Sequence, residues 1–149
     1  MFKHILLPTD GSALAAKGVK TGVRLAKALG ARVTGVYVIE PYLPPIMPET
    51  AVMAGAALDP GDYDKATKGH AAKTLARLES DARGAQVRCA TQSVSAAQPW
   101  QGILKVARAR GCDAIVIASH GRGGLGGLIL GSQTARVLAH SKIPVLVIR

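Results

Sequence analysis

A glycine-rich stretch between residues 121 and 132 holds the residues whose spacing points most directly to chemistry. Its first six residues, Gly121 to Gly126, match the GxGxxG pattern of dinucleotide-binding loops and follow a predicted strand. Such a loop also needs an acidic residue about 20 positions further on. No Asp or Glu follows Asp113, so we reject a dinucleotide site. A P-loop is excluded as well, because the chain contains no Gly-Lys-Ser or Gly-Lys-Thr triplet.

The end of the same stretch, Gly131-Ser132, opens a predicted helix. Glycine lets the backbone approach a ligand closely, and the first turn of a helix offers unpaired N–H groups at the positive end of the helix dipole. These two properties together predict a phosphate site. In the alternative interpretation, Gly131 is a turn residue and Ser132 is an ordinary N-cap.

Other polar residues stand directly after predicted strands, where ligands of open parallel sheets bind. They are Pro8-Thr9-Asp10-Gly11-Ser12 after the first strand, Glu40 after the second, and Ser119-His120-Gly121-Arg122 after the fourth. From residue 119 to the end, every residue with a full charge is basic, which favours an anion at this corner: Arg122, Arg136, Lys142 and Arg149.

Each of these polar residues also has a plainer interpretation. Asp10 can be a ligand residue or the cap of the first helix, and its place after a strand favours the ligand. His120 can contact phosphate or shuttle protons, but a lone histidine is more often a polar loop residue. Arg122 can neutralise a phosphate or extend into solvent.

The elements that would position these residues alternate along the whole chain. Strands are predicted at 4–7, 33–39, 86–92, 114–118 and 143–148, and the third is expected at a sheet edge. Helices are predicted at 12–29, 99–110 and 132–140, and another runs through Ala71, Leu75, Leu78 and Ala82. This order predicts one α/β domain over residues 1–149, a doubly wound five-stranded parallel sheet with helices on both faces. The proline-rich segment 40–61 is expected to be a lid or a disordered loop.

Composition limits the class of protein. The chain has 149 residues, of which 48% are hydrophobic and 19% charged, a size that buries an ordinary core without disulfides. No apolar run approaches the ~20 residues of a membrane span, and the first ten residues lack the apolar region of a signal peptide. We therefore expect a cytoplasmic protein. Cys89 and Cys112 have neither disulfide nor zinc-site spacing and are expected to be buried thiols.

The net charge of +10 is compatible with an anionic ligand, a nucleic acid or a well-solvated surface. Four cations repeat at helical spacing on the first helix: Lys17, Lys20, Arg24 and Lys27. A solvated helix face is favoured over a nucleic-acid contact, because no recognition motif accompanies them and aromatic residues make up only 3% of the chain. Trp100, in the first turn of the third helix, is expected to pack in the core or at its rim.

Three segments of the chain resemble the universal stress protein family: residues 8–12 (PTDGS), 115–132 (IVIASHGRGGLGGLILGS) and 143–148 (IPVLVI). The ATP-binding subgroup of that family carries a glycine, two residues, a second glycine, nine residues and then Gly-Ser or Gly-Thr. The second glycine is Gly121 here, and the last pair is Gly131-Ser132. The first glycine is replaced by Ala118. The resemblance spans essentially the whole chain and implies the strand order 3-2-1-4-5.

The resemblance also implies roles for single residues. Asp10 would accept the ribose hydroxyls, the backbone at Val38 would meet the adenine, and Ala118 would lie against the ribose. The backbone around Gly121 and Gly131 would hold the phosphates, together with Ser132 and Gln133. The complete nucleotide-binding set is Pro8, Thr9, Asp10, Val38, Ala118, His120, Gly121, Arg122, Gly131, Ser132 and Gln133.

The implied function is that of an adenine-nucleotide-binding stress-response regulator, which acts through nucleotide-dependent conformation or through an unknown protein partner. Its ligand would be ATP or another adenine nucleotide, with or without Mg²⁺, and neither a catalytic residue nor a metal site is predicted. Two alternatives stay open, a slow ATPase and a module that has lost nucleotide binding through Ala118. The last strand has no charge before Arg149, and such an apolar sheet edge predicts a homodimer.

Overall fold

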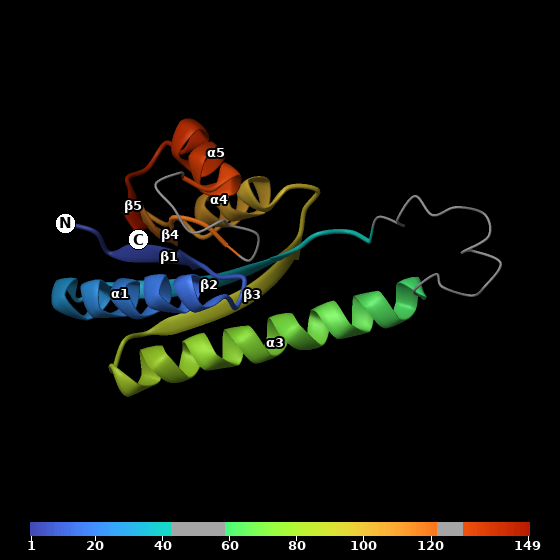
Figure 1. The fold of residues 1–149 in the computed structure, drawn as a ribbon. Helices are drawn as coiled ribbons and strands as arrows, with labels where there is room; N and C mark the ends of the chain where they lie inside the picture. The colour runs from blue at the N-terminus through green and yellow to red at the C-terminus, as the bar shows by residue number, and fades with distance from the viewer. Residues whose placement is uncertain (43–58, 122–129) are drawn as a thin grey trace.

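The computed structural model describes residues 1–42, 59–121 and 130–149. Its strands are β1 (His4–Pro8), β2 (Arg32–Ile39), β3 (Cys89–Ser95), β4 (Ala114–Ala118) and β5 (Val145–Ile148). Its helices are α1 (Ala13–Leu29), α3 (Pro60–Gly84), α4 (Pro99–Ala109) and α5 (Ser132–His140). The strands form one parallel sheet in the order β3-β2-β1-β4-β5 (Figure 1). The predicted fold class and strand order are confirmed.

The sheet lies between two helical layers, as Figure 1 shows. On one face α1 and α3 enclose a core that includes Leu7, Val23 and Leu78. On the other face α4 and α5 enclose a second core that includes Ile103 and Val137. Because the central strands β1 and β4 are covered on both faces, every residue in them is buried. This is the continuous apolar pattern that internal parallel strands require.

The first helix begins and ends where the sequence predicts. The Ser12 hydroxyl accepts a hydrogen bond from the Ala15 N–H at 3.2 Å, so Ser12 is its N-cap. Gly30 takes the left-handed conformation, with φ of 64°, and closes the C-terminus. The side chains of Lys17, Lys20, Arg24 and Lys27 are exposed.

Two predicted strands differ from the observed ones by more than one residue. The third strand is Cys89–Ser95 rather than residues 86–92, because the preceding residues complete the end of α3. Gln86 has φ of 61°, and the Val87 N–H donates to the Ala82 carbonyl at 2.9 Å. The strand does lie at an edge of the sheet, as expected. The last strand is Val145–Ile148 rather than residues 143–148, since Pro144 has no N–H with which to extend the pairing.

The segment predicted as a loop ends earlier than expected. Pro60 and Gly61 belong to the first turn of α3, which Asp59 caps by accepting the Gly61 N–H at 2.6 Å. Residues 43–58 lie outside the described chain, and with them most of the lid or disordered loop expected there. Arg122 and the rest of 122–129 also lie outside it.

Both cysteines are free thiols. Cys112 is buried as expected, whereas Cys89, at the edge of the sheet, is only half-buried. Loss of hydration raises the pKa of each thiol to about 11, and a neighbouring carboxylate adds to the effect, Glu79 beside Cys89 and Asp113 beside Cys112. Across the described ranges, no helix is long and apolar enough to span a membrane.

Candidate functional site

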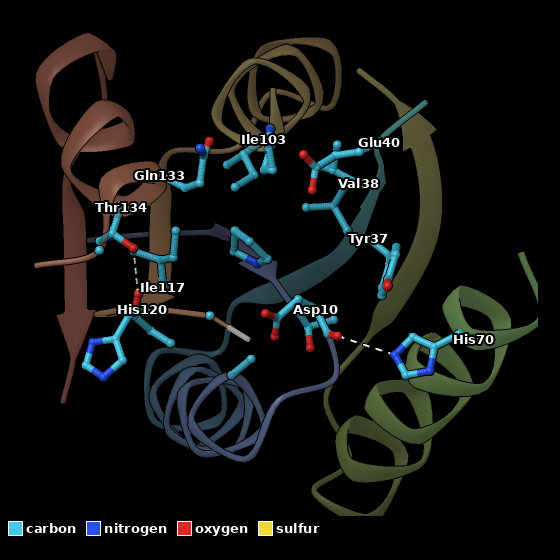
Figure 2. A pocket seen from close by; sticks show the side chains of 18 of the residues that line it. Asp10, Tyr37, Val38, Glu40, His70, Ile103, Ile117, His120, Gln133 and Thr134 are labelled. Atoms are coloured by element: carbon cyan, nitrogen blue, oxygen red, sulfur yellow. Dashed lines mark hydrogen bonds between the residues drawn. The ribbon is translucent and has the colours of Figure 1, made fainter. Parts of the chain in front are cut away.

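A cavity of about 720 Å³ lies beyond the carboxyl ends of β1, β2 and β4, and α3, α4 and α5 contribute to its walls (Figure 2). All the predicted site residues except Arg122 line it: Pro8, Thr9, Asp10, Val38, Ala118, His120, Gly121, Gly131, Ser132 and Gln133. Arg122 lies outside the described residues. The fold thus brings together residues far apart in the sequence, while their contacts with a ligand stay predictions.

One end of the cavity is the N-terminus of α5. Its N-cap is Gly131, which has no side chain to bond the first turn. The Gly131 N–H donates to the Ser119 carbonyl at 2.8 Å. The next three N–H groups, of Ser132, Gln133 and Thr134, have no acceptor within the helix because of helix geometry. An anion in this corner would find three donors and the positive end of the helix dipole.

The first turn of α5 is anchored to the end of β4. The Thr134 hydroxyl donates to the Ala118 carbonyl at 2.9 Å, and both residues are buried. The methyl group of Ala118 packs toward α1, where a Cβ atom built on Gly18 would lie 3.7 Å from it. The alanine that replaces the motif glycine therefore fits beside α1, and even a Cβ atom at position 18 would make only ordinary contact with it. Nearby, Ser119 Oγ and His120 Nδ1 are 3.0 Å apart in a hydrogen bond.

Asp10 occupies the centre of the cavity floor, in the loop between β1 and α1 (Figure 2). Its Oδ1 accepts the Ser12 N–H at 2.9 Å, so it does organise the start of the first helix. Its other carboxylate oxygen lies against Gly121, where any Cβ atom would collide with it. The interpretation of Asp10 as a residue that organises the helix start is confirmed, and its role as a ligand residue stays a prediction for a side chain that lines the cavity.

The other end of the cavity is the carboxyl end of β2. The Val36 carbonyl accepts the Thr9 N–H at 2.9 Å on the β1 side, and the Ile39 carbonyl accepts the Ala96 N–H at 3.1 Å on the β3 side. Backbone groups alternate sides along a strand. The N–H and C=O of Val38 are therefore directed to the β1 side, beyond the point where β1 has ended, and one donor and one acceptor face the cavity.

α3 contributes a wall of the cavity that was not predicted from the sequence. Tyr63, Thr67 and His70 line the cavity together with Tyr37 of β2. The His70 ring packs edge-on to Tyr37, with centroids 5.8 Å apart, and His70 Nε2 lies 3.4 Å from the Asp10 carbonyl oxygen. Apolar periodicity is weak in this half of α3, so no pattern in the sequence placed these side chains at the site.

A second missed wall comes from α4. Pro99 and Ile103 line the cavity, and Gly102 packs so closely on β2 that a Cβ atom built there would lie 2.8 Å from the Val38 side chain. The Gln133 side chain extends toward this helix, since its Oε1 accepts the Trp100 N–H at 3.2 Å. Trp100 itself is partly buried and stacks on His140, with centroids 4.5 Å apart, as expected for a residue at the rim of the core.

Charge is unevenly distributed around the cavity. The lining residues that the structure describes include two carboxylates, Asp10 and Glu40, and no Lys or Arg. Within this part of the chain, the N-terminus of α5 supplies the cavity with the positive end of a helix dipole. No group of three or more metal-ligating side chains is found within residues 1–42, 59–121 and 130–149.

An open sheet whose winding reverses between β1 and β4 defines an α/β protein of the doubly wound class, and the cavity lies at the reversal point, where ligands of such sheets generally bind. The family is identified by comparison, because the model of the universal stress protein family matches residues 1–149. The chain belongs to the universal stress protein family.

Individual relatives agree with this assignment. A universal stress protein of Thermus aquaticus, described as lying in the QAH/OAS sulfhydrylase 3′ region, is 31% identical, with 100% of both chains covered. Universal stress protein UspA from Lactobacillus plantarum has a similar structure, with a TM-score of 0.80, 22% identity, and 99% of this chain and 97% of that one covered. The universal stress protein from Archaeoglobus fulgidus in complex with dAMP has a TM-score of 0.67 and 16% identity, over 100% and 98% of the two chains.

Proposed function

We propose that the cavity binds an adenine nucleotide, ATP or a related adenine nucleotide with or without Mg²⁺, and that the protein is a cytoplasmic regulator whose conformation or partner binding depends on that ligand. The phosphates would lie at the N-terminus of α5, the ribose at Asp10, and the base at Val38. A solved relative of the same fold is a complex with dAMP, which supports the same class of ligand here.

The observation that carries the proposal is the chemical polarity of the cavity. Three N–H groups at the start of α5 suit a phosphate, whereas the backbone edge of Val38 offers one donor and one acceptor. The Watson–Crick edge of adenine carries the complementary pair, an acceptor at N1 and donor hydrogens on N6. Asp10 lies between the two ends (Figure 2), where a carboxylate can accept hydrogen bonds from sugar hydroxyls.

Ala118 does not argue against this ligand. Its methyl group lies next to α1 near Gly18, and Ala118 as a whole is only 6% exposed. The alternative of a module that lost nucleotide binding through this alanine therefore has no support from the packing.

The most direct test of the proposal is whether the protein retains a nucleotide through purification. The protein is purified without added nucleotide and mildly denatured, and the released small molecules are identified by chromatography and mass spectrometry. Isothermal titration of nucleotide-free protein with ATP, ADP, AMP and GTP follows. Released adenine nucleotide, or adenine nucleotides binding more tightly than GTP, supports the proposal. If the protein binds none of these nucleotides, the proposal is wrong.

We also propose a homodimer that forms through β5. This strand pairs only with β4, and its outer edge faces no other described strand. Leu146 in it is 46% exposed, a large fraction for a leucine in a sheet. Two copies related by a two-fold axis would pair these edges in one self-complementary contact.

A further inference from the structure

We propose that the Gln133 side chain is a positioning residue that sets the distance between the phosphate end and the base end of the cavity. The inference rests on the proposed function, because it describes how this chain aligns two halves of one nucleotide site. In this role the side chain of Gln133 does not bind phosphate. Only the backbone N–H of Gln133 would do so.

The side chain of Gln133 is already engaged with α4. Its Oε1 accepts the Trp100 N–H at 3.2 Å, and its Nε2 donates to Gln98 Oε1 at 3.4 Å. The N-cap of α4, Gln98, makes no capping bond with its own side chain, and Pro99 in the first position has no N–H. Gln133 therefore supplies from α5 the acceptor that the first turn of α4 lacks.

The helix that Gln133 holds carries the base end of the cavity. Ile103 and Pro99 of α4 line the wall beside Val38. Gly102 packs closely against the Val38 side chain, so the position of α4 bears directly on the end of β2. Displacing the first turn of α4 would therefore displace the surface on which the base rests.

The other end of this connection is fixed independently. Thr134 and Gly131 tie the first turn of α5 to the end of β4 through the Ala118 and Ser119 carbonyls. Gln133 stands in the same turn, and Figure 2 shows it between Thr134 and Ile103. Among the described residues, its side chain supplies the polar link between the phosphate-facing turn and the base-facing helix.

The hydrogen bonds of Gln133 should affect the affinity of a ligand that occupies both subsites at once. A nucleotide gains affinity over its fragments when the protein holds both subsites at the distance that the ligand spans. Removing the link leaves each subsite intact but lets their separation vary. The nucleotide then loses affinity, whereas adenosine and inorganic phosphate, which each occupy one subsite, do not.

The test compares the full-length parent with Gln133→Met, which keeps the length of the side chain and removes its amide. Affinities for ADP, adenosine and inorganic phosphate are measured by titration followed with NMR. The bond is present in both the free and the bound protein, so its loss acts on the coupling between the two subsites, and we expect an affinity loss of about fivefold for ADP. Affinities for adenosine and for phosphate should each change less than about twofold.

Gln92→Met is the matched control. Gln92 is a glutamine whose Oε1 also accepts hydrogen bonds, from Arg110 Nε at 2.8 Å and from Arg110 Nη2, and it does not line the cavity. Its replacement should leave all three affinities unchanged. An unchanged ADP affinity in Gln133→Met would overturn the inference, and so would parallel losses for ADP and phosphate, which would make the side chain a phosphate ligand. Failure of the parent to bind ADP would instead overturn the proposed function itself.

A second measurement follows the bond directly. The chain has a single tryptophan, so selective ¹⁵N-tryptophan labelling gives one backbone amide signal, that of Trp100. We expect its hydrogen exchange to stay slow or to slow further when ADP binds to the parent, and to be faster in Gln133→Met. Faster exchange of this amide in the parent on addition of ADP would show that Gln133 leaves Trp100 for the ligand, and would contradict a positioning role.

Discussion

Gly131 lies directly against His120, so closely that a Cβ atom built on Gly131 would come within 2.9 Å of His120 Cβ and 3.0 Å of the Ser119 carbonyl oxygen. The backbone of Gly131 has φ of −60°, which any residue can adopt. Glycine is required here because of this close approach and not because of its conformational freedom. The contact sets how near the N-terminus of α5 comes to the end of β4.

Gly131→Val should therefore weaken adenine-nucleotide binding by about 100-fold or more, since the displaced first turn would misplace three N–H donors to a charged phosphate. Asp10→Ala should weaken it less, by about tenfold, because it removes only contacts with the sugar. Isothermal titration with ADP measures both.

Gly84→Val provides the control for introducing a β-branched residue in place of glycine. No atom lies within 4 Å of a Cβ built on Gly84, which is exposed at the end of α3. Its affinity for ADP should equal that of the parent. If Gly131→Val and Asp10→Ala both retain the parent's affinity, the nucleotide does not bind in this cavity.

ATP hydrolysis should be far slower than in enzymes that transfer phosphoryl groups. Among the described lining residues, neither carboxylate lies at the α5 end of the cavity, since Asp10 lies at its centre and Glu40 beside Val38 (Figure 2), and no lysine lines the cavity. We expect turnover well below the roughly 1–100 s⁻¹ of kinases. Phosphate release is measured with and without Mg²⁺. Turnover within that range that disappears in Gly131→Val would establish an ATPase and refute this expectation.

Dimerisation through β5 should be sensitive to a charge at Leu146. Val147 is partly buried against the core on the α4 and α5 face, so a lysine there would disturb packing within the protein, whereas Leu146 is exposed. Leu146→Lys should convert a dimer into a monomer, because two copies would place like charges at the same edge. Sedimentation velocity measures the change.

Leu138→Lys serves as the control for adding a lysine at an exposed leucine. Leu138 is 41% exposed on α5, which covers the opposite face of the sheet from the one that Leu146 faces. This variant should remain dimeric. A monomeric parent, or a Leu146→Lys variant that sediments as the dimer, would exclude β5 as the interface.

Stability should fall as the pH drops below neutrality because of His4. Burial is the main cause that lowers the pKa of His4 below its ordinary value of 6.5, and the nearby positive charge of Arg32 acts in the same direction. Below about pH 6.5 the unfolded chain therefore binds a proton that the folded protein does not take up. The free energy of unfolding decreases from there down to the folded-state pKa.

Urea denaturation between about pH 7.5 and pH 5 measures this dependence. His4→Gln should give a shallower decrease than the parent, because the titrating group is absent. Thr34→Val removes the partner of His4 Nε2, at 2.7 Å, and should lower stability at every pH while keeping the slope. Asp113 does not interfere: burial opposes its ionisation, but the N–H groups of Lys3 and His4 together hold its pKa below 3.8, outside this range. If the free energy of unfolding falls equally steeply with decreasing pH in the parent and in His4→Gln, His4 is not the cause of the pH dependence.

Local patterns in the sequence were sufficient to predict the bounds of an element whose two ends are marked by neighbouring residues. The strand Ala114–Ala118 and the helix Ser132–His140 were predicted with the bounds that the structure has, because an apolar run bounded by polar residues and a Gly-Ser helix start are local signals. The start of β3 could not be predicted in this way. It depends on how α3 ends at Gln86, in a left-handed conformation that a non-glycine residue adopts only in context.

The sequence by itself determined the doubly wound fold, the family and the set of strand ends at which a ligand would lie, since hydrophobic alternation and motif spacing are properties of the linear chain. Only the tertiary structure decided which other side chains face that ligand. His70 reaches the cavity because α3 packs along β2, and Gln133 bonds Trp100 across 33 positions of sequence because α4 and α5 lie side by side. Such contacts depend on how helices pack on the sheet, which no local pattern specifies.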